Sequence, residues 1–301
     1  PMEKENYSKE FGAAINVTAS TTGLIIPPSN VLIVYSLASG GVSIASLFLA
    51  GYIPGILMGL ALMLVAAVWI KKKKYPPGEK TNVKRIATSF LDALPSLLLL
   101  VVVIGGIVSG IFTATEASGI AVLYTLVLAA IYREINLKKL HKIFLNSVVT
   151  TSIVLLLIAT SMGMSWVMSF ENIPQTVSDA LLGLSDNKYV ILIIINLLLL
   201  FVGTFMDMTP AILIFTPIFL PIMQSLGVDP VHFGMIMVMN LCVGLCTPPV
   251  GSVLFIGVGV AKTTIQKVIK PLLPLYVVMA IILLLVTYVP QISLWLPSLF
   301  E

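Results

Sequence analysis

The sequence predicts an all-α polytopic membrane protein of inverted-repeat architecture, with broken helices and a re-entrant hairpin. Three observations lead to this fold class. The chain is 58% hydrophobic and only 10% charged, and its mean hydropathy of +1.07 lies far above that of soluble domains. Apolar runs of about 20 residues, the length that crosses a bilayer, recur along the chain. A segment with two adjacent prolines occurs twice, each time inside a long apolar run.

The apolar runs account for most of the chain. In order they are Val31–Ile70 with a Gly/Pro interruption, Ala93–Phe112, Ile143–Met168, Val190–Phe205, Val231–Val260 and Leu272–Val289. Because such runs can cross the hydrocarbon core as helices, we expect a multi-pass membrane protein with hardly any soluble domain.

Basic residues give the direction of the spans. Sixteen of the 17 Lys and Arg residues fall in four clusters, within residues 4–9, 71–85, 133–142 and 262–270. The positive-inside rule places these clusters in the cytoplasm. The other connections hold one basic residue, Lys188, among several acids, and are predicted to be external. Positive charge confined to short loops gives no support for nucleic-acid binding.

The repeated segment is Gly23–Ser29 (GLIIPPS), which returns 221 positions later as Gly244–Val250 (GLCTPPV). A Pro-Pro pair breaks a helix, because each ring removes an N–H and crowds the carbonyl group four residues back. The carbonyl groups of Gly23 and Leu24, and those of Gly244 and Leu245, should therefore be free. Matching breaks in two halves of a membrane protein indicate a transporter binding site.

The two broken helices should run in opposite directions. The first, over 11–40, follows a charged internal segment, whereas the second, over 231–260, follows an external segment and leads inward to Lys262. Similar sequence with opposite direction predicts an inverted repeat. The predicted organisation is an end of the first repeat over 1–70, a cytoplasmic linker over 71–85 and a second repeat over 86–301 that closes with a span over 271–296.

A re-entrant hairpin is predicted over residues 188–222. Its apolar arms, Tyr189–Phe205 and Ala211–Leu220, join at Met206–Pro210. The second arm is too short to cross about 30 Å of hydrocarbon and both ends are external, so the tip should reach the membrane interior. The repeat implies a counterpart hairpin before residue 1, and we expect the sequence to be incomplete at this end.

Asp207 lies at the predicted tip. An ionised carboxylate at bilayer depth costs about 2.5–3.5 kcal/mol, so it needs a cation or water. The apolar segments contain no Lys or Arg to pair with it. A hard alkali cation, held by carboxylate, hydroxyl and carbonyl oxygens, fits this position. Alternatively, Asp207 caps the second arm by accepting backbone N–H bonds, and both roles can hold together.

The breaks offer groups of both signs. Helix segments that begin after Pro28 and Pro249 present N–H groups and a positive dipole end to a carboxylate. Segments that end at Gly23 and Gly244 present carbonyl oxygens to Na⁺. The predicted Na⁺ ligands are Gly23, Leu24, Asp207, Thr209, Gly244, Leu245 and Thr247, and the predicted substrate contacts are Thr21, Ser29, Thr209 and Thr247. The alternative is that each Pro-Pro pair only kinks a packed helix.

A further polar patch contains Thr113, Thr115 and Glu116, and glycines bound it on both sides. These residues are additional site candidates. Thr and Ser before Glu also suit a helix N-terminus, and we favour that structural role.

No enzyme site is visible in the sequence. Neither His belongs to a cluster of polar residues inside the membrane. The sequence also contains no Gly-x-Ser-x-Gly motif and no phosphate-binding glycine loop. Cys242 and Cys246 lie on one helix face in apolar sequence, where we expect them to pack as small residues.

Four motifs carry a resemblance to a known family: Gly23–Ser29, Leu47–Gly55 (LFLAGYIPG), Gly105–Ala117 (GGIVSGIFTATEA) and Gly244–Gly251 (GLCTPPVG). Together they resemble the large membrane subunit of tripartite ATP-independent periplasmic (TRAP) transporters, over essentially all 301 residues. The Gly-Tyr usual in that family before the first broken helix is Asn6-Tyr7 here. The resemblance implies a further N-terminal portion with the first hairpin, which we expect to precede residue 1.

The resemblance implies Na⁺-driven uptake of an organic acid across the bacterial inner membrane by an elevator-like motion, without an organic cofactor. The implied partners are a periplasmic substrate-binding protein and a small membrane subunit, separate or fused, in the lipid bilayer. Family substrates include C4-dicarboxylates, sialic acid and other sugar acids, and Glu3–Ser46 resembles the sialic-acid members.

Two other functions stay open at this point. One is a stand-alone Na⁺/carboxylate symporter that works without a binding protein. The other is a membrane-embedded enzyme that uses Asp207 and Glu116 as an acid pair, which would need the two side chains about 5–10 Å apart.

Overall fold

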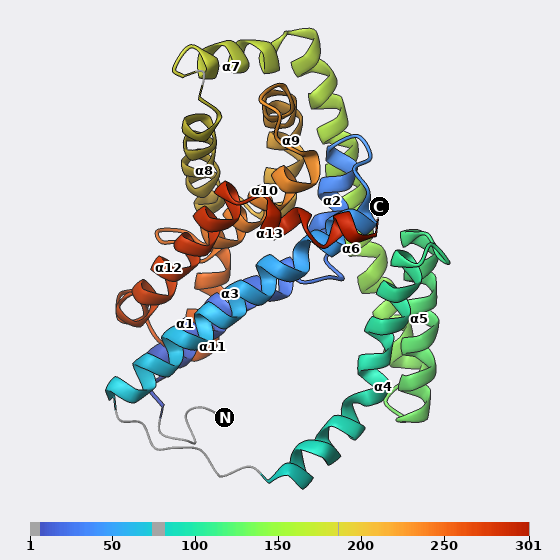
Figure 1. The fold of residues 1–301 in the computed structure, drawn as a ribbon. Coiled ribbons are helices and arrows are strands. Elements are labelled where there is room, and N and C mark those ends of the chain that lie inside the picture. The colour runs from blue at the N-terminus through green and yellow to red at the C-terminus, as the bar shows by residue number, and fades with distance from the viewer. Residues whose placement is uncertain (1–6, 74–81, 186, 301) are drawn as a thin grey trace. The chain divides into compact units, whose positions relative to one another are not determined.

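The computed structural model describes residues 7–73, 82–185 and 187–300, and every regular element in these ranges is helical (Figure 1). The helices are α1 (Lys9–Ile25), α2 (Asn30–Ala38), α3 (Ile44–Lys73), α4 (Val83–Val108), α5 (Ala114–Ile131), α6 (Leu137–Phe170), α7 (Ile173–Leu182), α8 (Lys188–Phe205), α9 (Met208–Ser225), α10 (Pro230–Leu245), α11 (Ser252–Ala261), α12 (Ile265–Tyr288), α13 (Gln291–Leu294) and the 3₁₀ helix η1 (Pro297–Leu299). Seven of these described helices are long and apolar enough to span a membrane, and α1 with α2 forms a bent pair that passes the same test. The predicted all-α polytopic fold is confirmed.

The chain folds as two compact units. The first consists of Pro1–Pro77 with Ser161–Glu301, and the second is Gly78–Thr160. The first unit holds both proline-interrupted helix pairs and the arms of the predicted hairpin. The second holds α4, α5 and most of α6.

Helix α10 forms the centre of the first unit. All of its residues from His232 to Leu245 are buried, which is what a helix with an apolar surface on every side requires. It packs against α8, α9, α1, α12 and α3. The helix begins at Pro230, and Asp229 caps it by accepting the N–H groups of Val231 and His232 at 2.7 and 3.1 Å.

The two broken helices run in opposite directions, as predicted. At one end, near the start of α1 and the end of α11, Thr263 Oγ1 donates to Glu10 Oε1 at 3.4 Å. At the other end, the Tyr35 hydroxyl of α2 donates to the Pro230 carbonyl at the start of α10, at 2.7 Å. Residue numbers therefore fall along one broken helix as they rise along the other, which is the arrangement that an inverted repeat requires.

The arms of the hairpin differ from the prediction in length. The second arm, α9, is an 18-residue helix and passes the membrane-span test, so the expectation of an arm too short to cross is wrong. Pro217 and Pro221 lie inside α9 without ending it, because membrane helices tolerate proline where neighbours satisfy the backbone. The arms α8 and α9 make few contacts with each other and pack on α10 instead (Figure 1).

Two other predicted boundaries change. Lys71–Lys73 continue α3 and Lys84 lies in α4, so the predicted linker over 71–85 is shorter at both ends. Its middle, residues 74–81, lies outside the described residues. The last span begins at Ile265, before Pro271, and ends at Tyr288 rather than at 296.

The second unit is held by local contacts between α4 and α5. The Tyr124 hydroxyl donates to the Pro95 carbonyl at 2.7 Å, and the Phe112 ring covers Gly106.

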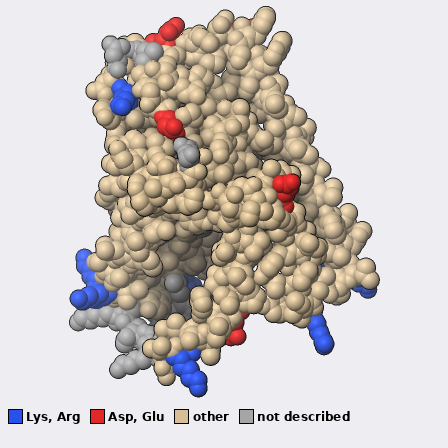
Figure 2. Space-filling view, turned by 45° about the vertical axis from the view of Figure 1, so that its right-hand side comes forward, with Lys and Arg blue, Asp and Glu red and all other residues tan. Residues whose placement is uncertain are grey.

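Large apolar side chains remain exposed along the long helices, among them Leu64, Val101, Leu156 and Phe201. On the face that Figure 2 shows, charged side chains are few and most of the surface is uncharged. Such a surface suits the hydrocarbon of a bilayer.

Substitution of Gly244 by Val tests the close backbone approach of α8 and α10. A Cβ atom on Gly244 would lie 2.7 Å from Gly203 Cα, and this backbone cannot move aside without separating α8 from α10. We expect Gly244→Val to lower the free energy of unfolding by about 1–3 kcal/mol. The measurement is thermal unfolding of the purified protein in detergent. Gly259→Val in α11 is the control, because a Cβ there meets nothing within 4 Å; equal stability of the two variants would contradict the close contact.

Candidate functional site

The first break lies between Ile25, the last residue of α1, and Asn30, the first of α2, and the two helices meet at a bend of 52°. The Ile26 N–H donates to Thr22 O at 2.9 Å, so the helical ladder closes one residue before the prolines. In the described structure no hydrogen bond reaches the carbonyl of Gly23, as predicted.

The prediction that Leu24 is also free is wrong. Its carbonyl accepts a hydrogen bond from the Ser29 hydroxyl at 2.6 Å. The chain folds back after the two prolines and brings this buried serine over the carbonyl five residues earlier. Ser29 therefore bridges the break, which explains why its side chain does not cap α2.

The second break follows Leu245, and α11 resumes at Ser252. The prediction of a free Gly244 carbonyl is wrong, because it accepts the Thr247 N–H at 2.8 Å in a tight turn. The Leu245 carbonyl receives no hydrogen bond from the described residues. Of the four carbonyls predicted to be free, Gly23 in the first break and Leu245 in the second accept no hydrogen bond from the described residues.

The hydroxyl groups beside the breaks keep acceptor capacity. Thr21, only 1% exposed, donates to Thr18 O at 2.6 Å, and Thr247 donates to Val243 O at 2.8 Å. A hydroxyl that donates its proton still carries two lone pairs. Both oxygens can therefore ligate a cation without breaking a hydrogen bond.

The hairpin tip lies beside the second break. The Gly251 N–H, just before α11, donates to the Thr204 carbonyl near the end of α8 at 2.9 Å. On the other side of the tip, Cys242 Sγ lies 3.9 Å from Met208 Sδ. This contact is consistent with the packing role expected of Cys242, and Cys246 is likewise buried, with its Sγ 3.4 Å from Val17 O.

Asp207 occupies the N-cap position of α9 with extended backbone angles, but in the described part of the chain its side chain makes no capping hydrogen bond. Asp207 therefore has the position that the capping alternative predicts, but it does not make the hydrogen bond that capping requires. Its carboxylate is exposed, and Thr209 follows in the first turn, half-buried. The geometry leaves both oxygens of the carboxylate available to a ligand.

The polar patch of the second unit has a structural role. Thr113 and Glu116 form a reciprocal capping box: the Thr113 N–H donates to Glu116 Oε2 at 2.8 Å, and the Glu116 N–H donates to Thr113 Oγ1 at 3.3 Å. Thr115 is exposed and its carbonyl accepts the Ser118 hydroxyl at 2.6 Å. These bonds support the structural explanation over a binding site.

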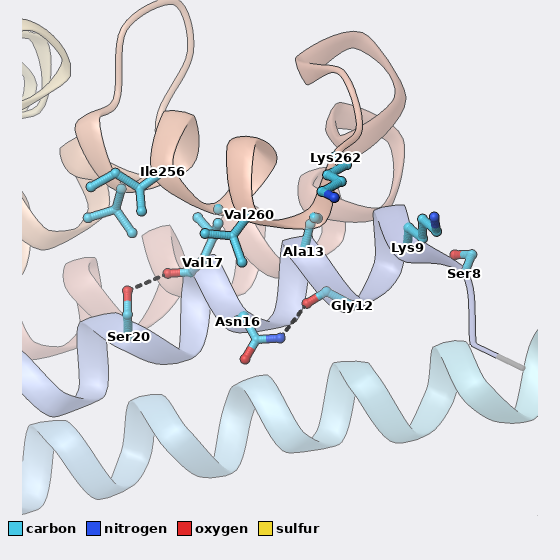
Figure 3. A pocket seen from close by; sticks show the side chains of 13 residues that line it. Ser8, Lys9, Gly12, Ala13, Asn16, Val17, Ser20, Ile256, Val260 and Lys262 are labelled. Atoms are coloured by element: carbon cyan, nitrogen blue, oxygen red, sulfur yellow. Dashed lines mark hydrogen bonds between the residues drawn. The ribbon is translucent and has the colours of Figure 1, made fainter. Parts of the chain in front are cut away.

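A cavity of about 740 Å³ follows the crossing of α1 and α11 (Figure 3). Asn16 and Ser20 line it from α1, and Ile256 and Val260 line it from α11. Lys9 and Lys262 lie together at one end of this groove, which the positive-inside rule assigns to the cytoplasm.

Sequence reasoning missed two features of this region. The Thr204 carbonyl joins the tip to the break, and this backbone contact leaves no side-chain pattern. A buried chain of Asn196, Asn240 and Thr287 connects α8, α10 and α12. Two asparagines in otherwise apolar segments were the available signal for that second feature.

Comparison with known proteins gives a consistent result. Residues 1–292 match the family model described as the DctM component of tripartite ATP-independent periplasmic transporters. The chain is 61% identical to the uncharacterized protein YgiK of Salmonella typhimurium, over 99% of this chain and 69% of that protein. It is 42% identical to the isethionate TRAP transporter permease protein DctMQ of Oleidesulfovibrio alaskensis (98% and 46%), and 39% identical to the C4-dicarboxylate TRAP transporter large permease protein DctM of Pseudomonas aeruginosa (99% and 70%).

Replacement of Pro248 and Pro249 by alanine tests whether the prolines cause the second break. The variant regains two N–H groups that can donate to Gly244 and Leu245, so α10 should extend toward α11. We expect slower amide hydrogen exchange over residues 245–251 while the protein still inserts. Unchanged exchange would show that other contacts impose the break.

Proposed function

Because the chain belongs to the DctM family of TRAP transporter large permeases, we propose that it takes up a small organic acid by coupling to Na⁺. The protein is a multi-pass inner-membrane permease. The observation that carries the ion-coupling proposal is the pair of opposed helix breaks, in which the Gly23 and Leu245 carbonyls accept no hydrogen bond from the described residues.

In the proposal, one Na⁺ binds at each break. At the second break its ligands are the Leu245 carbonyl, the remaining lone pair of Gly244 O, the Thr247 hydroxyl, and Asp207 with Thr209 from the hairpin tip. At the first break they are the Gly23 carbonyl and the second lone pair of Leu24 O. Carbonyl, hydroxyl and carboxylate oxygens are the ligands that hard cations prefer.

The substrate carboxylate binds next to the ions. The first N–H groups of α2, after Ser29, and of α11, after Gly251, have no partner within their own helices. These donors and the positive helix ends suit an anion where the apolar segments supply no Arg or Lys. The hydroxyls of Thr21, Ser29, Thr209 and Thr247 complete the contacts.

We keep the substrate class predicted from the sequence, an organic acid such as sialic acid or a C4-dicarboxylate. Proteins similar to this chain carry the names of isethionate, C4-dicarboxylate and sialic acid transporters. All three ligands are small organic anions, and a site built from helix ends and hydroxyls recognises the anionic group they share. We therefore propose an organic acid, with C4-dicarboxylates and sialic acid as the first to test.

The proposed partners follow from the tripartite and periplasmic description of the family. A soluble periplasmic protein delivers the substrate, and a small membrane subunit supports the permease. The unit with both breaks moves across the membrane as an elevator. Relatives of the chain are transporter permeases, which points away from the enzyme with Asp207 and Glu116 as its acid pair.

Uptake into proteoliposomes tests the function. We expect the full-length protein to accumulate labelled substrate only with an inward Na⁺ gradient and the cognate binding protein. Equal uptake in Na⁺-free buffer would contradict the coupling. Uptake with no binding protein would favour the alternative of a stand-alone Na⁺/carboxylate symporter.

Asp207→Asn tests the role of the hairpin tip. The change removes a negative ligand but keeps the size of the side chain, so we expect the half-saturating Na⁺ concentration to rise roughly tenfold, about 1.4 kcal/mol, with little change in thermal stability. The measurement is initial uptake rate against Na⁺ concentration. Asp179→Asn, at an exposed acid of α7, is the control and should behave as wild type. A wild-type Na⁺ response of Asp207→Asn would exclude the ion role.

A further inference from the structure

Three polar side chains meet in the apolar core of the first unit, outside the residues that form the breaks. Asn196 of α8 is 3% exposed, Asn240 of α10 is 0% and Thr287 of α12 is 1%. They form one chain of hydrogen bonds. Asn240 Nδ2 donates to Asn196 Oδ1, and Asn196 Nδ2 donates to Thr287 Oγ1 at 3.3 Å. We call these three residues the core clamp.

Thr287 connects the core clamp to two further groups, the Leu283 carbonyl and the His232 side chain. Thr287 Oγ1 donates to Leu283 O at 2.8 Å within α12. The Thr287 carbonyl lies 3.3 Å from His232 Nε2, and His232 Nδ1 lies 2.7 Å from Ser293 Oγ. The clamp thus joins α8, α10 and α12, and the contacts of His232 with Thr287 and Ser293 support it at the end of α12.

The position of the clamp relates it to the second break. On α8, Asn196 lies two turns before Gly203, and on α10, Asn240 lies one turn before Gly244. Gly203 and Gly244 bring the two backbones close together, because a Cβ on Gly244 would lie 2.7 Å from Gly203 Cα. Glycine contacts allow close approach but do not fix how far one helix slides along another, whereas hydrogen bonds have direction.

The core clamp is not the arrangement that maximises stability. The Oδ1 atom of Asn240 is buried and has no hydrogen-bond partner among the described residues. A partly satisfied polar network is less stable than an apolar core of the same shape. A role in setting geometry accounts for this cost.

We propose that Asn196 and Asn240 are positioning residues for the second break. They hold α8 in register with α10, so that the hairpin tip stays beside the turn from Gly244 to Gly251. The bond from the Gly251 N–H to Thr204 O reports this register directly. The inference rests on the proposed function in one respect: it takes the second break to be an ion site.

The test uses the double variant Asn196→Leu/Asn240→Leu in the full-length protein. Both polar groups are replaced together, so neither leaves the other unpaired, and Thr287 keeps its bond to Leu283. We expect equal or higher thermal stability, at least fivefold faster amide exchange at Gly251, and at least a fivefold rise in the half-saturating Na⁺ concentration. The substrate KM at saturating Na⁺ should stay unchanged.

Thr216→Val is the matched control. It removes a buried hydroxyl whose oxygen lies 3.2 Å from Met237 Sδ, between α9 and α10, and should leave Gly251 exchange and the Na⁺ response as in wild type. Single Asn→Leu variants complete a double-mutant cycle, in which the effects on Gly251 exchange should be non-additive.

The outcomes separate this inference from the function on which it rests. Wild-type exchange at Gly251 in the double variant would overturn the clamp. Faster exchange with an unchanged Na⁺ response would also overturn it, because register would then not matter for the ions. If wild-type uptake needs no Na⁺, the proposed coupling fails, while Gly251 exchange still decides whether the clamp sets the register.

Discussion

The hydrogen bonding of the peptide backbone inside the bilayer is the constraint on which this structure depends. Hydrocarbon offers no partners, so each N–H and carbonyl must be satisfied by the protein, and helices are the usual answer. Two Pro-Pro pairs interrupt helices at matching points of the chain. Hydrogen bonds satisfy some of the backbone groups at the breaks. The Ser29 hydroxyl donates to the Leu24 carbonyl, the Thr247 N–H donates to the Gly244 carbonyl, and the Gly251 N–H donates to the Thr204 carbonyl. Among the described residues, the carbonyls of Gly23 and Leu245 accept no hydrogen bond, and a cation can bind such oxygens without displacing a partner.

The two broken helices lie side by side and run in opposite directions. The start of α1 meets the end of α11, and the end of α2 meets the start of α10. Each break is therefore enclosed by a different set of neighbours. The hairpin tip reaches the second break through Thr204 and Met208, whereas α3 packs on the first, where a Cβ on Gly51 would lie 2.5 Å from Ile25 O.

The fold class, the breaks and the opposed directions could be predicted from the sequence, because they follow from apolar length, proline and loop charge. Local capping was also readable at Thr113 and Glu116. The length of α9 was not, since the tolerance of Pro217 and Pro221 depends on packing rather than on local propensity. Which carbonyl is covered at each break depends on the bend after the prolines, and only coordinates give that bend. The core clamp joins residues up to 91 positions apart, as from Asn196 to Thr287, and no local pattern specifies such a contact.

The breaks also explain how a cation and an anion can depend on each other in one site. An interrupted helix ends in carbonyl oxygens and resumes with N–H groups, so each break presents both kinds of group within a few residues. On the proposed function, Na⁺ at the carbonyl side lowers the cost of placing a carboxylate at the N–H side, and the reverse holds by linkage. This coupling needs no intramembrane Arg, and none occurs in the apolar segments. A fixed Arg would favour binding of the carboxylate in every state of the transporter. A bound Na⁺, which can leave the site, instead makes binding of the carboxylate depend on Na⁺.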